Sequence, residues 1–333
     1  MTSLSPPPGG FAPRRRLLAA AAGAGLLGWA GAGRAADAPD GAATLVLGDQ
    51  ANGTRARVEA AKVLDGAPFR YRWANFQGAA PLFEAVRAGA VDTAPAGDTP
   101  VLAAAAANSR IRIVATSVGP AKSVAIVVQR GSPIRRVADL AGRGVVVSSA
   151  RGSVAQYLLI GTLREAGVDP AAVEVRFVMP TDALPAFRAG LIEAWATFDP
   201  YLAVAEDAGG RVLRDGEGIN TGRGFLAASE KALADPARRA AIHDLLARLG
   251  RAWDWSEANR AAYEKVYAEQ TRLAPAIVSK VLARGYQALR PVNEGDVVAV
   301  QRVADLFADL ALLPRRVDVR ALVDPEFFTR GAA

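Results

Sequence analysis

The sequence of 333 residues contains no cysteine and a single histidine, His243. Without cysteine the chain can form no disulfide, thiolate metal site, iron–sulfur ligation or thiol nucleophile, and it offers no cysteine for a lipid anchor. One histidine excludes a multi-histidine metal centre, and the helical spacing around His243 predicts a surface or packing residue. These two absences remove much of common enzyme chemistry, and we expect no metal, no cofactor and no catalytic residue.

The chain also lacks the signature of a nucleic-acid-binding protein. Its net charge is +7, but no run of Lys and Arg is interleaved with aromatic residues, which make up 7% of the chain. Residues 1–38 hold four Arg and one Asp, so +3 of that charge lies there and +4 is spread over the rest. A mildly basic body suits a small anionic ligand.

The first residues have the order of an export signal. Arg14–Arg16 precedes a mildly apolar Ala/Gly/Leu stretch, Leu17–Ala32, and small residues follow it. The paired arginines and weak hydrophobicity are typical of a twin-arginine signal peptide, and the stretch is too short and interrupted for a good membrane span. A basic leader without function is the alternative. We expect residues 1–38 to direct export to the periplasm, with cleavage between about Gly33 and Pro39.

Short apolar strands alternate with helices of about ten residues over residues 44–208, which predicts an α/β fold of βαβ units. The apolar run Val124–Val128 is expected to carry the chain into a second lobe, and Phe225–Ala228 to bring it back. Only helical spacing follows, so the sequence predicts two lobes joined by a two-strand hinge, with a helical C-terminal part on the first lobe. The predicted boundaries are 39–123 with 224–333 for the first lobe and 124–223 for the second.

Two stretches 101 residues apart, Arg87–Pro100 and Arg188–Tyr201, echo each other. Each predicts a helix that ends at Gly, then an acidic residue followed by a short strand, and an Asp at the start of the next helix. In open α/β sheets ligands bind at such corners, outside the carboxyl ends of the strands. We expect Asp98 and Asp199 to be the N-caps of two helices that face one cleft, with Gly97 and Thr99 beside the first.

Aromatic residues and amides near these corners are further candidates for the site. Trp195 and Tyr201 flank Asp199, and each is either a core residue or a clamp for the apolar body of a ligand. Gln50 and Asn52, in the first strand-to-helix turn, either donate to a ligand or cap a helix. Their spacing alone leaves both roles open.

A third helix start follows the strand predicted at 144–148. Ser153 can cap the helix that begins there, and the backbone N–H groups and hydroxyls of Ser149, Gly152 and Ser153 would favour an anion. Arg151 is either a counter-charge for that anion or a solvated loop residue. A plain Ser cap with a tight Gly turn is the alternative for this segment.

Several short motifs, in order along residues 44–320, carry a family resemblance. They are Gly97-Asp98-Thr99-Pro100, Asp139-Leu140-Ala141-Gly142, Arg151-Gly152-Ser153 with Leu158-Leu159, Ala194-Trp195 with Asp199-Pro200-Tyr201, Phe225–Ala228, Pro291-Val292-Asn293, and Ala304–Phe307 with Pro314 and Val317-Asp318. With them the chain resembles the aliphatic sulfonate-binding proteins, the periplasmic receptors of ABC importers, in a superfamily with taurine-, nitrate- and thiamine-precursor-binding relatives.

The resemblance implies a type II periplasmic binding protein with its ligand between two lobes, delivered to a permease that works with a cytoplasmic ATPase. It also implies that Arg151-Gly152-Ser153 belongs to the ligand site. We expect a monomer that captures an aliphatic sulfonate or similar small organic anion.

The chain departs from the family pattern in that segment. The family commonly has Lys-Gly-Ser with further hydroxyls and a His, whereas this chain has Arg151, then Val154, Ala155 and Gln156. This puts the identity of the anion in question, so taurine, nitrate and a thiamine or pyrimidine precursor stand as alternatives. Aromatic sulfinate desulfinases also resemble the family, but they use a cysteine nucleophile that this chain lacks, so we do not expect an enzyme.

Overall fold

The computed structural model describes residues 41–285 and 288–327, so the predicted export signal lies outside the described residues. The strands are β1 (Thr44–Gln50), β2 (Arg70–Phe76), β3 (Thr93–Gly97), β4 (Ile111–Val118), β5 (Val124–Val128), β6 (Gly144–Ser148), β7 (Glu174–Val178), β8 (Ala194–Phe198), β9 (Arg211–Asp215) and β10 (Arg223–Ser229). The α-helices are α1 (Gly53–Ala61), α2 (Ala79–Arg87), α3 (Asp98–Ala106), α4 (Val154–Glu165), α5 (Pro180–Arg188), α6 (Tyr201–Asp207), α7 (Glu230–Ala234), α8 (Pro236–Ala258), α9 (Arg260–Thr271), α10 (Pro275–Ala283), α11 (Glu294–Asp309) and α12 (Val319–Leu322).

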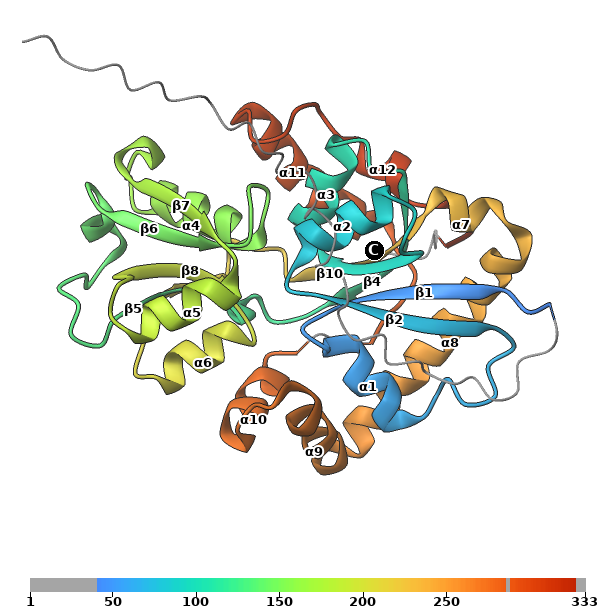
Figure 1. Cartoon of the computed structure of the whole chain (residues 1–333). Coiled ribbons are helices and arrows are strands. Elements are labelled where there is room, and N and C mark those ends of the chain that lie inside the picture. Colours follow the sequence, from blue (N-terminus) through green and yellow to red (C-terminus); the bar gives the residue numbers. More distant parts are fainter. Residues whose placement is uncertain (1–40, 286–287, 328–333) are drawn as a thin grey trace, which may run out of the picture. The chain divides into compact units, whose positions relative to one another are not determined.

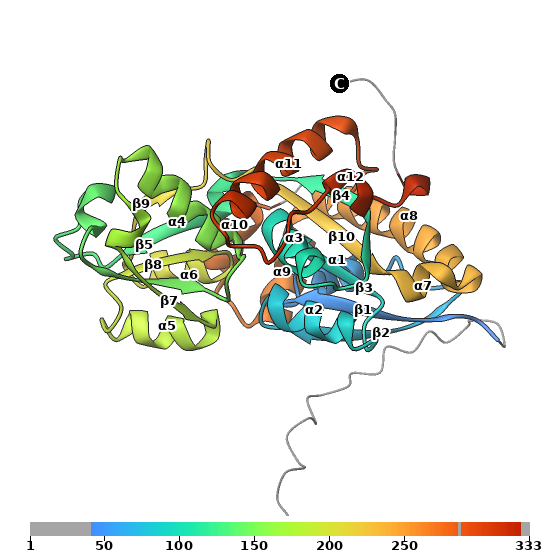
Figure 2. The ribbon, with the colours of Figure 1, turned by 90° about the horizontal axis from the view of Figure 1, so that it is seen from above.

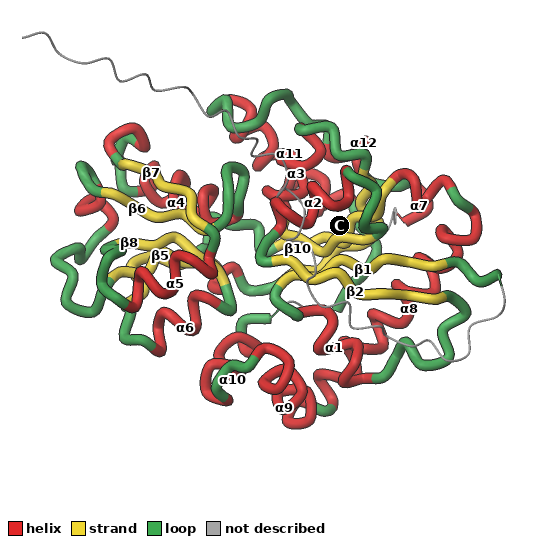
Figure 3. The backbone as a smooth tube through the Cα atoms, viewed as in Figure 1, coloured by secondary structure: helices red, strands yellow, loops and turns green. Residues whose placement is uncertain are grey.

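The strands form two five-stranded sheets, and we call each sheet with the helices on it a lobe (Figure 1). The sheet of lobe I has the order β2-β1-β3-β10-β4, and that of lobe II has the order β7-β6-β8-β5-β9. The chain passes from β4 into β5 and returns from β9 into β10, which are the two predicted crossovers. Figure 3 shows the strands in two groups, with β5 to β8 in one and β1, β2 and β10 in the other. Because β5 and β10 enter from the other lobe without a crossover helix, they run antiparallel to their neighbours, and both sheets are mixed.

Helices cover both faces of each sheet, which explains why the central strands are apolar throughout. In lobe I, α2, α3 and α11 pack on one face and α1 with α8 on the other (Figures 1 and 2). In lobe II, α4 covers one face, and α5 with α6 the other. Every residue of β5 is buried, as its unbroken run Val124–Val128 predicts. Helices α9 and α10 pack between α1 of lobe I and α6 of lobe II.

The structure adds elements that the periodicity did not predict. Strand β9 has the sequence Arg-Val-Leu-Arg-Asp and pairs only with β5 at the edge of its sheet, so charged residues occupy it. Helix α7 is one short turn after β10, capped by Ser229. No helix within the described residues is both long and apolar enough to span a membrane.

Candidate functional site

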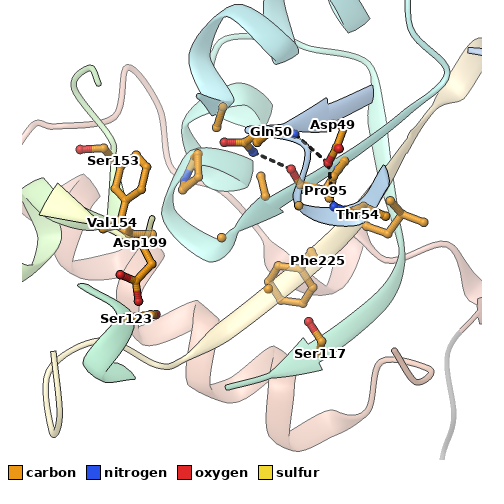
Figure 4. Close-up of a pocket in the computed structure, with 18 of the residues that line it drawn as sticks. Asp49, Gln50, Thr54, Pro95, Ser117, Ser123, Ser153, Val154, Asp199 and Phe225 are labelled. Carbon is orange, nitrogen blue, oxygen red and sulfur yellow. Dashed lines mark hydrogen bonds between the residues drawn. The ribbon is translucent and has the colours of Figure 1, made fainter. Parts of the chain in front are cut away.

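A cavity of about 520 Å³ is lined by residues from both lobes. Figure 4 shows Asp49, Gln50, Thr54 and Pro95 of lobe I on one side of it, and Ser153, Val154 and Asp199 of lobe II on the other. A cavity of this size accommodates a drug-sized ligand. The described residues that line it include six aromatic ones, namely Phe83, Phe198, Phe225, Trp253, Tyr263 and Tyr267. The described residues contain no group of three or more His, Asp or Glu side chains that could hold a metal ion.

The cavity brings together some of the residues singled out from the sequence and leaves others aside. Those that line it are Gln50, Gly97, Ser149, Arg151, Gly152, Ser153 and Asp199. Those that do not are Asn52, Asp98, Thr99, Trp195 and Tyr201.

The start of α4 forms the lobe II wall, and Ser153 is its N-cap, as expected: its Oγ accepts the N–H of Gln156 at 3.2 Å. The predicted backbone donors, however, have partners inside lobe II. The N–H groups of Ser149, Gly152 and Ser153 donate to Val178 O (3.1 Å), Gln156 Oε1 (2.7 Å) and Ala150 O (3.2 Å), respectively. The donors left to a ligand are therefore the two serine hydroxyls and the first-turn N–H of Val154, which has no partner within the helix. Arg151 is exposed, with its guanidinium 5.5 Å from the Phe177 ring.

Asp98 opens α3 as expected, but it is the first helical residue, and Gly97 is the N-cap. Its carboxylate accepts the N–H of Thr99 at 2.7 Å and the hydroxyl of Thr221, which lies between β9 and β10. Burial raises the pKa of Asp98. Asp98 therefore connects α3 to the segment that returns from lobe II, and Thr99 beside it is completely buried.

Asp199 faces the cavity at the equivalent corner of lobe II, where Pro200 rather than Asp199 is the N-cap of α6. Its carboxylate accepts the N–H of Ala203 at 3.1 Å and lies 3.1 Å from the Nε of Arg284, which comes from the end of α10. Burial raises the pKa of Asp199 to about 7, although Arg284 acts in the opposite direction. This acid therefore has a charge that depends on pH near neutrality.

Trp195, Tyr201 and Asn52 do not contact the cavity. Trp195 is completely buried in the core of lobe II, where its indole N–H donates to Ser148 Oγ at 2.9 Å. The hydroxyl of Tyr201 donates to Gln77 of lobe I at 3.3 Å, and the amide of Asn52 donates to a backbone carbonyl of α9. Trp195 was expected to be either a core residue or a clamp for the ligand, and in the structure it is a core residue.

Asp49, at the end of β1, is a cavity residue that the sequence analysis missed. Its two carboxylate oxygens accept three backbone N–H groups, from Gln50 (2.9 Å), Thr54 (3.0 Å) and Arg55 (3.0 Å). Burial raises its pKa to about 6, against the effect of these hydrogen bonds. The carboxylate thus fixes the turn into α1. The neighbouring Gln50 side chain donates to Pro95 O at 2.6 Å, so it joins β1 to β3.

Arg57 on α1 is the second missed residue. Its guanidinium lies 4.0 Å above the Trp253 ring and 5.1 Å from the Tyr263 ring, and the residue is only 7% exposed. Trp253 lines the cavity beneath this cation. The signal in the sequence was a charged residue between Ala56 and Val58, both of which are buried on α1.

Comparisons with known proteins match this chain to periplasmic binding proteins. The family described as "ABC transporter, phosphonate, periplasmic substrate-binding protein" matches residues 61–276. A protein of Escherichia coli (strain K12) named for binding aliphatic sulfonates is 34% identical over 251 residues, 74% of this chain and 77% of that protein.

Two solved structures share the fold over nearly their whole length. The alkanesulfonate-binding protein SsuA from Xanthomonas axonopodis pv. citri, bound to MOPS, is 31% identical with a TM-score of 0.79, covering 87% of this chain and 99% of its own. The periplasmic aliphatic sulphonate binding protein SsuA from Escherichia coli is 28% identical with a TM-score of 0.75, covering 86% and 98%. The two-lobed α/β fold expected from the sequence is thereby confirmed.

Proposed function

The chain belongs to the family of periplasmic substrate-binding proteins of ABC transporters, and from this premise we propose that it captures an organic sulfonate in the cavity between its lobes. The observation that carries the proposal is a cavity that has aromatic residues in its wall and a helix start at one side. A sulfonate presents three oxygens on an apolar body. Such a cavity offers hydrogen-bond donors for the oxygens and apolar surface for the body. The loaded protein then delivers the sulfonate to a permease with its ATPase.

We assign the sulfonate oxygens to the first turn of α4. The hydroxyls of Ser149 and Ser153 and the N–H of Val154 are the donors there, and the helix dipole favours a negative group at this end. Arg151 adds a positive charge at the mouth of the cavity. A hydrogen bond to a charged group contributes about 1.5–3 kcal/mol, so a few donors suffice to orient the head group.

The remaining parts of the proposal concern export and activity. Residues 1–38 direct the chain to the periplasm by a twin-arginine signal, where it acts as a monomer. The chain transports rather than transforms its ligand, since the thiol that a desulfinase uses is absent. Among the alternative ligands, nitrate is the least suitable, because so small an ion would leave most of a cavity of about 520 Å³ unfilled.

Sulfonates are expected to raise the thermal unfolding temperature of the purified mature protein. A ligand at a hundredfold excess over its Kd adds about 2.7 kcal/mol to the stability of the folded state. We would screen ethanesulfonate, benzenesulfonate, MOPS, taurine, nitrate and methylphosphonate, with sulfate as the control for ionic strength. Stabilisation by nitrate or methylphosphonate but by none of the sulfonates would contradict the proposal.

A further inference from the structure

Among the described residues, the cavity contains a buried cation without an anionic partner. Arg57 is 7% exposed and lines the lobe I side, and its Nε and Nη1 atoms are buried with no hydrogen-bond acceptor from this part of the chain. A guanidinium carries five N–H donors in a planar fork and stays charged at every pH that proteins tolerate. Leaving such a group without an acceptor away from water is costly.

Nearby groups do not balance this charge. Both carboxylate oxygens of Asp49 accept backbone N–H groups, from the end of β1 and the start of α1. The rings of Trp253 and Tyr263 stabilise the cation through their π faces. Stacking therefore holds the guanidinium in place, while its Nε and Nη1 atoms have no acceptor among the described residues.

We propose that Arg57 is a second anion subsite, and that the ligand carries a carboxylate in addition to its sulfonate. The sulfonate lies at the start of α4 on the lobe II side, as in the proposed function. This inference rests on that proposed function. The carboxylate meets the fork of Arg57 on the lobe I side of the same cavity. An apolar body between the two acids packs against the aromatic wall.

Such a ligand connects the two lobes through its two ends. Its carboxylate accepts charge-assisted N–H bonds from the guanidinium, and arginine discriminates well between acids and neutral groups. A monofunctional sulfonate leaves that subsite empty and the cation unpaired. Arg57 thus determines which sulfonates bind tightly.

Matched ligand pairs test this with the mature wild-type protein, by isothermal titration calorimetry. We would compare 4-sulfobenzoate with benzenesulfonate and 3-sulfopropanoate with propanesulfonate. The two members of each pair differ by one carboxylate, and the two pairs differ in the length of the ligand. In at least one pair, the acid-bearing member is expected to bind about 10- to 100-fold more tightly, the usual value of a charge-assisted hydrogen bond.

Variants locate that preference. Arg57→Gln should weaken 4-sulfobenzoate much more than benzenesulfonate, so that the preference disappears, and Arg57→Lys should keep only part of it, because a point charge replaces the fork. Arg55→Gln is the matched control: it removes an arginine two residues away that pairs with Glu59 at 2.6 Å and does not line the cavity. Thermal unfolding without ligand checks that each variant folds.

The outcomes separate this inference from the proposed function. If benzenesulfonate binds but neither acid-bearing ligand gains over its parent, the second subsite is refuted and the sulfonate function stands. If Arg57→Gln weakens benzenesulfonate as much as 4-sulfobenzoate, Arg57 holds the sulfonate itself and the inference is wrong. If no sulfonate binds the wild type, the proposed function fails first.

Discussion

Replacing Asp199 by Asn is expected to reduce the loss of stability that accompanies a rise in pH from 4.5 to 7.5. Burial raises the pKa of Asp199 from 3.8 to about 7, so the folded chain holds this proton more tightly than the unfolded chain. The resulting stabilisation is fully present below pH 3.8 and is lost as the pH rises through 7. At 1.36 kcal/mol per pKa unit, the contribution is on the order of 4 kcal/mol.

Urea unfolding at pH 4.5, 6.0 and 7.5 measures this effect. Asp199→Asn keeps an oxygen for the N–H of Ala203, and Arg284 keeps its ion pair with Glu206 at 2.6 Å. The wild type should lose more stability across this range than the variant, and the residual slope of the variant belongs in part to Asp49, whose pKa is raised to about 6. Asp207→Asn, an exposed acid at the end of the same helix, is the control. An unchanged slope in Asp199→Asn would show that its proton affinity is the same in both states.

Much of the fold could be predicted because the spacing of apolar residues within each segment indicates a helix or a strand. The apolar run Val124–Val128 and the spacing in the segment that became α4 each identify an element that the structure confirms. β9 could not be found this way, since an edge strand with two arginines and an aspartate lacks a buried pattern.

The candidate site was less predictable because its chemistry depends on partners far along the chain. The similarity of the two stretches located both strand-to-helix turns. It could not show that the carboxylate of Asp98 accepts a hydrogen bond from Thr221, 123 residues away. Likewise, nothing near Arg57 in the sequence indicates that Trp253 covers its guanidinium. Local spacing identifies helix starts, whereas the side chains that line a cavity are selected by the packing of distant elements.

The second large effect is expected from Gly152→Ala, which should weaken sulfonate binding about 5- to 150-fold. Gly152 lies in the loop before α4, and a Cβ at this position would be 2.6 Å from the Cβ of Ala103 on α3 of lobe I. Since real carbon atoms do not approach so closely, the lobes would have to separate there. Overpacking of this kind costs about 1–3 kcal/mol, which corresponds to that loss in affinity if the ligand requires both walls of the cavity.

Two comparisons distinguish lobe contact from backbone strain. Gly152 has a φ of +79°, which disfavours alanine by itself, and Gly142→Ala introduces nearly the same strain at a φ of +75° with no heavy atom within 4 Å of the new Cβ. Calorimetry should therefore show near-wild-type affinity for Gly142→Ala. The double variant Gly152→Ala/Ala103→Gly removes the opposing methyl group, so it should recover most of the lost affinity. If the double variant binds as weakly as Gly152→Ala, the effect arises within the α4 loop, and the approach of α3 to that loop does not control binding.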